Sequence, residues 1–285
     1  MSDQAVSVID SHVHFWDPGE LTYPWVEALP PLRRRWAPED LAAATGGIPL
    51  GGLIFVECNC DPDQALAEVE MVETLAAEEP RIIGTVAFAD LTRPERLDDT
   101  LDRYQEFGRV RGIRHNIQGN EAGFCLRGQF VEGVRAAGRR GLTFDLCATH
   151  DQLPDVVELA RRCPQAKLVL DHCGKPAIGA GLLDPWREHI AALAELPNVW
   201  CKLSGLLTEA DPVGWSEADL IPYAGHVVDR FGSERVMYGG DWPVLTLAGS
   251  YRDWYQFTRN FTESWSLEER TAFYGGNALR FYFDR

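Results

Sequence analysis

The sequence predicts a single-domain α/β fold, a (β/α)8 barrel spanning residues 1–285. Three observations lead to this prediction: eight short apolar runs recur along the chain, helical patterns separate them, and most runs end in an ionisable side chain. Strands that alternate with helices indicate a parallel sheet. An open doubly wound sheet shows the same alternation. Only a closed barrel brings all the carboxyl ends of the strands around one mouth.

The elements follow in order along the chain. A helix is expected over 61–79, where Asp61 can cap and Pro62 suits the first helical position. Two more helices are expected at 153–162 and 185–196, each directly before a strand. The eight expected strands are residues 6–14, 52–59, 81–90, 110–118, 143–148, 166–173, 199–204 and 235–241.

A long loop is expected at about residues 17–40, where proline and tryptophan are frequent. It follows the first strand, so in a barrel it lies at the carboxyl end and can roof an active-site mouth. The sequence contains no internal repeat, low-complexity tract or linker that would mark a second domain.

Composition excludes several classes of partner. The formal net charge is -16 and the pI is near 4.8, which disfavours nucleic acids and anionic membranes. Seven cysteines, an odd number without a paired zinc-type spacing, indicate reduced thiols. No export signal and no stretch long enough to span a bilayer is recognised. We therefore expect a cytoplasmic protein whose number of subunits is open, a homo-oligomer included.

Imidazole and carboxylate groups stand at the ends of three expected strands. His12 and His14 are two residues apart, so on a strand they share one face and can address one ion or one carbonyl. His172 ends the sixth run, and Asp241 ends the eighth, beside the first strand in a closed barrel. Structural roles are the alternative: Asp241 could cap a turn and His172 could bond to backbone.

Five stretches, in order and at strand ends, carry a resemblance to a known family: IDSHVHFWDP, GIRHNIQ, LVLDHCGKP, CKLSGL and YGGDWPV. The chain resembles the amidohydrolase-2 branch of the amidohydrolase superfamily over nearly its whole length. Within that branch it is similar to the lactonases, which include fuconolactonases, rhamnonolactonases and pyrone-dicarboxylate lactonases. The resemblance implies a distorted barrel and a hydrolase that opens the lactone of a small sugar acid.

The resemblance also implies roles for residues at matching positions. His12, His14, His172 and Asp241 would form the hydrolytic centre and hold any metal ion. The pocket would be lined by three further groups: Arg114 and His115, with catalytic roles, and the Lys202 to Ser204 motif.

One departure from the family pattern leaves open whether a metal ion is bound. Metal-dependent relatives place a histidine on the fifth strand, but that run reads TFDLCA, with His150 just beyond it. The sequence thus predicts a divalent metal, zinc in the first instance, or catalysis without metal. Glu57 could replace the missing ligand, bind a substrate hydroxyl, or simply pair with Arg or Lys.

The expected reaction begins with a lactone carbonyl polarised by an ion on His12 and His14, or by the imidazoles directly. Asp241 takes a proton from water and returns it to the leaving hydroxyl. His172, Arg114 or the ion stabilises the oxyanion. The substrate is expected to contact Trp16, Glu57, Lys202, His115 and Trp242, while Arg114 could instead bind a substrate carboxylate.

Two alternatives come from other classes. One is a metal-dependent, non-oxidative decarboxylase of an aromatic or muconate-type acid, which the residue set on the fifth run disfavours. The other is a barrel that binds a small ligand without catalysis, because a fold alone does not fix a function.

Overall fold

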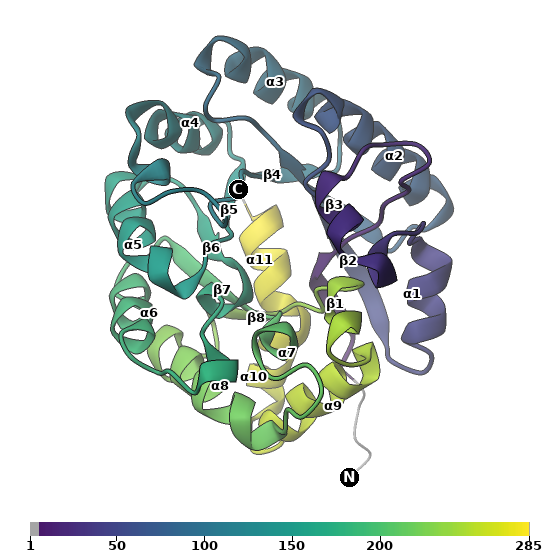
Figure 1. Cartoon of the computed structure of the whole chain (residues 1–285), viewed down its shortest axis with the longest axis vertical. Coiled ribbons are helices and arrows are strands. Elements are labelled where there is room, and N and C mark those ends of the chain that lie inside the picture. Colours follow the sequence, from purple (N-terminus) through teal and green to yellow (C-terminus); the bar gives the residue numbers. More distant parts are fainter. Residues whose placement is uncertain (1–5, 285) are drawn as a thin grey trace.

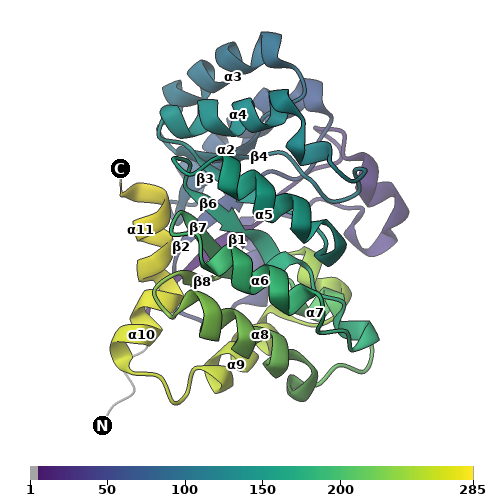
Figure 2. The ribbon, with the colours of Figure 1, turned by 90° about the vertical axis from the view of Figure 1, so that its left-hand side faces the viewer.

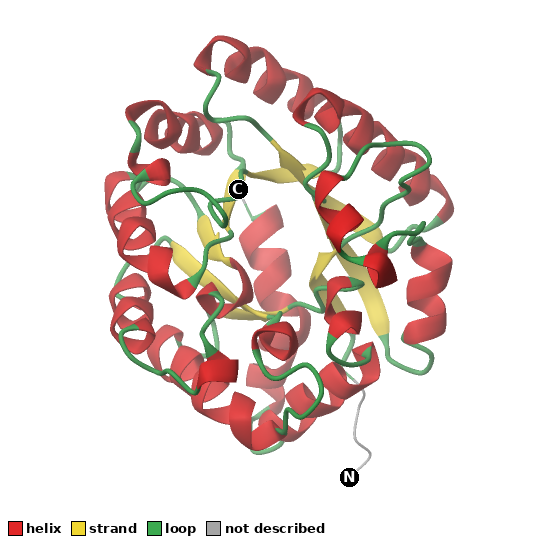
Figure 3. Cartoon of the chain, viewed as in Figure 1, coloured by secondary structure: helices red, strands yellow, loops and turns green. Residues whose placement is uncertain are grey.

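The computed structural model describes residues 6–284, so residues 1–5 and 285 of the predicted domain lie outside the described part. Eight parallel strands follow one another around a ring in sequence order, with helices on the outside (Figures 1 and 3). This arrangement confirms the predicted (β/α)8 barrel. The strands are β1 (Val8–Val13), β2 (Leu50–Val56), β3 (Ile82–Phe88), β4 (Val110–Arg114), β5 (Thr143–Leu146), β6 (Leu168–Leu170), β7 (Val199–Leu203) and β8 (Val236–Tyr238).

The seam between the last and first strands closes just beyond β8. The Asp241 amide donates to the His12 carbonyl oxygen at 2.8 Å, and the His14 amide donates to the Trp242 carbonyl oxygen at 2.8 Å. Residues 235–241 were expected as one strand, yet the regular strand stops earlier, and Asp241 has a φ of 54°. A left-handed residue cannot continue a strand, so its side chain is redirected beside the β1 histidines.

The helices pack around the ring (Figure 2). The expected helix at 61–79 is observed as α2, preceded by a 3-10 turn whose first amide is bonded by Asp61. The expected helices at 153–162 and 185–196 are α5 and α6. No helix within residues 6–284 is long and apolar enough to cross a membrane. The helices are α1 (Pro38–Ala44), α2 (Ala65–Glu78), α3 (Pro94–Glu106), α4 (Gly128–Arg139), α5 (Leu153–Arg162), α6 (Trp186–Ala194), α7 (Leu206–Glu209), α8 (Glu217–Phe231), α9 (Tyr251–Phe261), α10 (Leu267–Thr271) and α11 (Asn277–Phe283).

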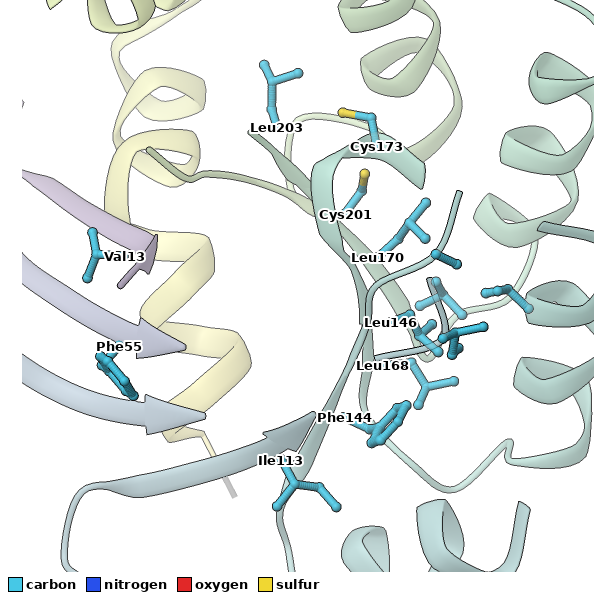
Figure 4. Packing of buried hydrophobic residues seen from close by; sticks show 14 of the residues in the cluster. Val13, Phe55, Ile113, Phe144, Leu146, Leu168, Leu170, Cys173, Cys201 and Leu203 are labelled. Atoms are coloured by element: carbon cyan, nitrogen blue, oxygen red, sulfur yellow. The ribbon is translucent and has the colours of Figure 1, made fainter. Parts of the chain in front are cut away.

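The larger hydrophobic core lies between strands and helices. Phe144 and Leu146 on β5 and Leu168 on β6 point away from the barrel axis toward the helices (Figure 4). Successive strand residues face opposite sides, so the residue between Phe144 and Leu146, Asp145, faces the interior. The apolar outward face therefore fixes which polar side chains enter the barrel.

The C-terminal helix α11 closes the amino end of the barrel, which the sequence did not reveal. It lies at the centre of the ring in Figure 1 and at one end of the barrel in Figure 2, opposite α7. Its apolar residues complete a second buried cluster inside the strands. The cluster consists of Ile54, Val56, Val86, Val169, Met237, Ala278, Phe281 and Tyr282.

The loop after β1 is ordered by its aromatic residues. Trp16 and Trp36 form a short antiparallel bridge, and the Trp16 ring lies 5.3 Å from Trp25 and 6.4 Å from Tyr23. The Trp25 indole N–H donates to the Cys58 carbonyl oxygen at 2.7 Å, which fastens this loop to the end of β2. The loop at 17–40 thus packs over the carboxyl end of the first two strands.

Glu68 on α2 makes stability depend on pH. Its side chain is buried and accepts from the Cys58 amide at 3.1 Å, and burial, assisted by Glu57, raises the pKa of Glu68 to about 8. Between its ordinary pKa and about 8, the folded state holds a proton that the unfolded chain lacks, so the free energy of unfolding falls as pH rises. We expect Glu68→Gln to remove this slope in urea unfolding at about pH 5 and about pH 9. Glu70→Gln, exposed on the same helix, should keep it; an unchanged slope in Glu68→Gln would contradict the assignment.

Candidate active site

Three imidazoles and one carboxylate meet at the carboxyl end of the barrel. His12 and His14 come from the end of β1, His172 follows β6, and Asp241 follows β8. Asp241 Oδ1 lies 3.5 Å from His14 Nε2 and 3.9 Å from both His12 Nε2 and His172 Nε2. The two β1 imidazoles approach each other at 3.1 Å, Nε2 to Nε2. The structure therefore brings together the four residues predicted as the hydrolytic centre.

The backbone around this centre adopts unusual conformations. His172, Cys173, Lys175 and Asp241 all have φ between 45° and 55°. Such conformations cost free energy in residues other than glycine and are often found at functional sites. Gly205 is equally constrained, because an added Cβ would lie 2.6 Å from His172 Nδ1. The turn after β7 must therefore carry no side chain at Gly205 for the His172 ring to fit.

Each imidazole is oriented by a partner on its outer nitrogen. His14 Nδ1 lies 2.7 Å from the Val56 carbonyl oxygen, and His172 Nδ1 lies 2.9 Å from Ser204 Oγ. His12 Nδ1 lies 3.1 Å from Lys202 Nζ. Ligand histidines in metal sites commonly donate the N–H that faces away from the ion to an acceptor. His14 and His172 have such acceptors, whereas the Lys202 ammonium opposite His12 Nδ1 can only donate.

The donor set fits a divalent cation. Two groups of side chains have ligand atoms within 4.8 Å of one another: His12, His14 and Asp241, and His12, Asp171 and His172. Tetrahedral zinc with nitrogen ligands at about 2.0–2.1 Å requires ligand atoms about 3.3 Å apart. The observed separations bracket that value: 3.1 Å between His12 Nε2 and His14 Nε2, and 3.5 to 3.9 Å from Asp241 Oδ1 to the three imidazoles. Neither group includes Glu57 or His150, the extra ligands considered from sequence.

Burial and charge set the ionisation of these groups. Burial lowers the pKa of His172 to about 4 and, with the Lys202 ammonium, holds the pKa of His12 well below its usual range. Both rings are thus neutral near pH 7. Burial alone would raise the pKa of Asp241, but the neighbouring His172, His14 and His12 more than offset it and hold that pKa low. The centre combines lone pairs of neutral imidazoles with an ionised carboxylate.

An ionic network lies beneath this centre inside the barrel. Arg114 donates through Nε to Glu57 Oε1 at 2.5 Å and through Nη1 to Asp171 Oδ2 at 3.3 Å. Lys202 Nζ contacts Asp171 Oδ1 at 3.0 Å and Asp145 Oδ2 at 2.5 Å. All five side chains are at most 4% exposed. With Asp241 there are four carboxyl groups for two cationic side chains, an excess of acid that favours a bound cation.

The structure does not bring His115 to the centre. Its ring packs against Phe88, Phe124 and Phe130, and its Nδ1 accepts from the Leu91 amide at 3.0 Å. Arg114 and His115 are adjacent on the chain, so when one faces the barrel interior the other faces the helices. The catalytic role expected for His115 from the family resemblance is therefore not retained.

Four residues expected to contact substrate are already committed to protein partners. Trp16 and Trp242 are each 1% exposed, and Glu57 and Lys202 are fully buried in the network. The Trp16 indole N–H donates to the Leu32 carbonyl oxygen at 3.2 Å. We therefore retain none of the four as a direct substrate contact. Glu57 instead has the structural role considered from the sequence, because its carboxylate pairs with Arg114.

Sequence reasoning missed two residues of the site, Asp171 and Lys175. Asp171 pairs with Arg114 and Lys202, while Ser204, part of the motif that the resemblance indicated, orients His172. Lys175, partly exposed, forms an ion pair with Glu209 of α7 at 2.9 Å. Asp171 and Lys175 flank His172 in the sequence, and a polar cluster that ends an apolar strand was a usable signal for both.

Comparison with known proteins identifies the family of this chain. A family model described as Amidohydrolase matches residues 9–283. Similar relatives are L-fucono-1,5-lactonases from Burkholderia multivorans, 36% identical over 96% of this chain and 95% of the relative, and from Burkholderia ambifaria, 31% identical over 96% and 94%. A crystal structure of an amidohydrolase from Burkholderia multivorans with bound Zn is 35% identical, with a TM-score of 0.86 over 97% of this chain and 99% of that one. The chain belongs to the amidohydrolase family.

Proposed function

We propose that this protein hydrolyses the lactone ring of a small sugar acid. The observation that carries the proposal is the approach of Asp241 to three imidazoles within 3.9 Å at the carboxyl end of the barrel. Relatives above 30% identity that match this chain almost end to end are named L-fucono-1,5-lactonases. All seven cysteines are unpaired, which supports a reducing compartment such as the cytoplasm.

Asp241 is the group that accepts a proton from the attacking water. A carboxylate with a depressed pKa is a weak base, so the water and the carbonyl must both be polarised for the transfer to be fast. The oxygen of that water bonds to the lactone carbonyl carbon, and the carbonyl oxygen becomes an oxyanion. When the ring C–O bond breaks, Asp241 returns its proton to the departing ring oxygen, which leaves a hydroxy acid.

A divalent ion, zinc in the first instance, would be held by His12, His14, His172 and Asp241. When bound it would polarise the carbonyl and acidify water. Without it, an imidazole N–H directed at the carbonyl oxygen supplies the same stabilisation to a smaller degree. Lys175, three residues after His172, and its partner Glu209 are both partly exposed and are suited to bind substrate hydroxyl groups.

A panel of five-membered and six-membered aldonolactones, L-fucono-1,5-lactone included, tests the proposal by acid release at near-neutral pH. We expect turnover of at least one sugar lactone well above the rate without enzyme. Release of carbon dioxide from aromatic or muconate-type acids, with no lactone turnover, would instead identify a decarboxylase. Tight binding of sugar acids with neither reaction would leave a ligand-binding barrel.

Metal content is tested on the same protein. We expect one zinc per chain in the wild type after equilibration with zinc, and at least tenfold weaker binding in His14→Asn. His150→Asn serves as the matched control, because His150 follows β5 but belongs to neither candidate ligand group. Equal zinc binding by all three proteins would refute the proposed ligand set.

A further inference from the structure

Lys202 is a fully buried cation that donates hydrogen bonds to Asp145 and His12 and forms an ion pair with Asp171. Its Nζ lies 2.5 Å from Asp145 Oδ2, 3.0 Å from Asp171 Oδ1 and 3.1 Å from His12 Nδ1. An ammonium group has three N–H donors and no acceptor. The neutral His12 ring therefore accepts at Nδ1, and its single proton resides on Nε2.

The opposite end of the same chain of hydrogen bonds leads to the same assignment. His14 Nδ1 lies 2.7 Å from the Val56 carbonyl oxygen, which can only accept. The proton of a neutral His14 ring is thus on Nδ1, and its Nε2 presents a lone pair. That lone pair faces His12 Nε2 at 3.1 Å, so the contact between the two rings requires a proton on His12 Nε2.

The alternative form of His12 is disfavoured by geometry. A proton on Nδ1 would have to be donated to Asp171 Oδ1 at 3.4 Å, longer than the contact with Lys202. It would also oppose an N–H of Lys202, and two lone pairs would face each other across the His12 to His14 contact. The contact with Lys202 and the contact with His14 both favour the proton on Nε2.

Lys202 is itself positioned by residues toward the amino end of the barrel, which α11 closes. Asp145 on β5 accepts from Lys202 and from the Tyr282 hydroxyl at 2.9 Å, and Tyr282 belongs to α11. Hydrogen bonds thus run along the barrel axis from the C-terminal helix to the site. Asp145 and Lys202 are each 0% exposed, so bulk water does not compete for these contacts.

We propose that Lys202 is a positioning residue that fixes the proton of His12 on Nε2, aimed into the site beside His14, His172 and Asp241. The inference rests on the proposed lactone hydrolysis for its purpose, because the Nε2–H that donates to His14 in the free protein can donate to the lactone carbonyl oxygen once substrate is bound. A cation can bind His12 Nε2 only after the proton moves to Nδ1, facing Asp171. Lys202 therefore weakens the contribution of His12 to the proposed zinc site, which His14, His172 and Asp241 would share.

The test is the proton position on His12 in the metal-free, full-length protein with ¹⁵N-labelled histidine. Two-bond ¹H–¹⁵N correlations distinguish the two ring forms, and His12→Asn identifies the His12 signals by their loss. We expect the proton on Nε2 in the wild type. A wild-type His12 protonated on Nδ1, or on both nitrogens, overturns the proposal, and this measurement depends on no variant of Lys202.

Variants then test whether Lys202 determines the proton position on His12. Lys202→Met combined with Asp145→Asn removes one positive and one negative charge together. We expect the His12 proton to move to Nδ1, because the Asp171 carboxylate, no longer paired with Lys202, is a stronger acceptor than the His14 ring. Tyr282→Phe leaves Lys202 in place and should keep it on Nε2. If the double variant retains the Nε2 proton, Lys202 does not position it.

Kinetics separate positioning from substrate binding. In the double variant without metal, we expect kcat for the lactone to fall roughly 10²–10³-fold, as for loss of one oxyanion donor, with KM nearly unchanged. A raised KM with unchanged kcat would make Lys202 a substrate contact and overturn the proposal. Absence of wild-type lactone turnover would refute the proposed function instead, while the proton position on His12, measured without substrate, still decides the role of Lys202.

Discussion

Asp241→Asn should reduce lactone turnover at least roughly 10³-fold, within the range that a positioned general base contributes. The side chain keeps its shape, and asparagine tolerates the left-handed backbone of this position at least as well as aspartate. The amide cannot accept the proton of the attacking water. The loss should therefore lie in kcat, with folding retained in circular dichroism and thermal unfolding.

Asp90→Asn is the matched control for this variant. Asp90 follows β3 at the same end of the barrel, and its carboxylate bonds to Thr92 outside the imidazole cluster. We expect its kcat to stay within a few-fold of the wild type. Activity of Asp241→Asn within tenfold of the wild type would show that another group accepts the proton.

The barrel could be predicted because its signals are local. Each strand is a short apolar run, and helices such as α2 and α5 show their periodicity and starting residues within one segment. The role of α11 could not be predicted in the same way. Its apolar face packs against a surface that forms only when the eight strands close into a ring. Residues 277–283 alone therefore do not indicate where this helix will pack.

The centre itself was predictable from strand ends, but its surroundings were not. His12, His14, His172 and Asp241 each follow an apolar run, and topology alone brings such ends together. His115 is an instructive failure, since alternation along β4 allows only one of Arg114 and its neighbour to face inward. Which one does so depends on register, and β4 pairs with β3 through a register shift that the sequence does not display.

Arg114→Met should cause the largest loss of stability, about 3–5 kcal/mol in the free energy of unfolding. The guanidinium bonds the Glu57 carboxylate at 2.5 Å, the Glu57 carbonyl oxygen at 2.6 Å and Asp171 at 3.3 Å. Methionine fills much of the volume but leaves Glu57 fully buried without its cationic partner. Urea unfolding measures the loss. Adding Glu57→Gln to Arg114→Met should recover part of the free energy of unfolding, because it removes the unpaired buried charge.

Arg109→Met is the control that separates burial from ion pairing as such. Arg109 pairs with Glu73 at 2.6 Å, a distance close to that of the Arg114 pair, but its side chain is 37% exposed. Water solvates both partners once such a pair is broken, so we expect a change of at most about 1 kcal/mol. Equal destabilisation by the two variants would mean that the barrel interior screens charge as well as the surface does. In that case the buried ionic network would not explain why Asp171 stays ionised beside Lys202.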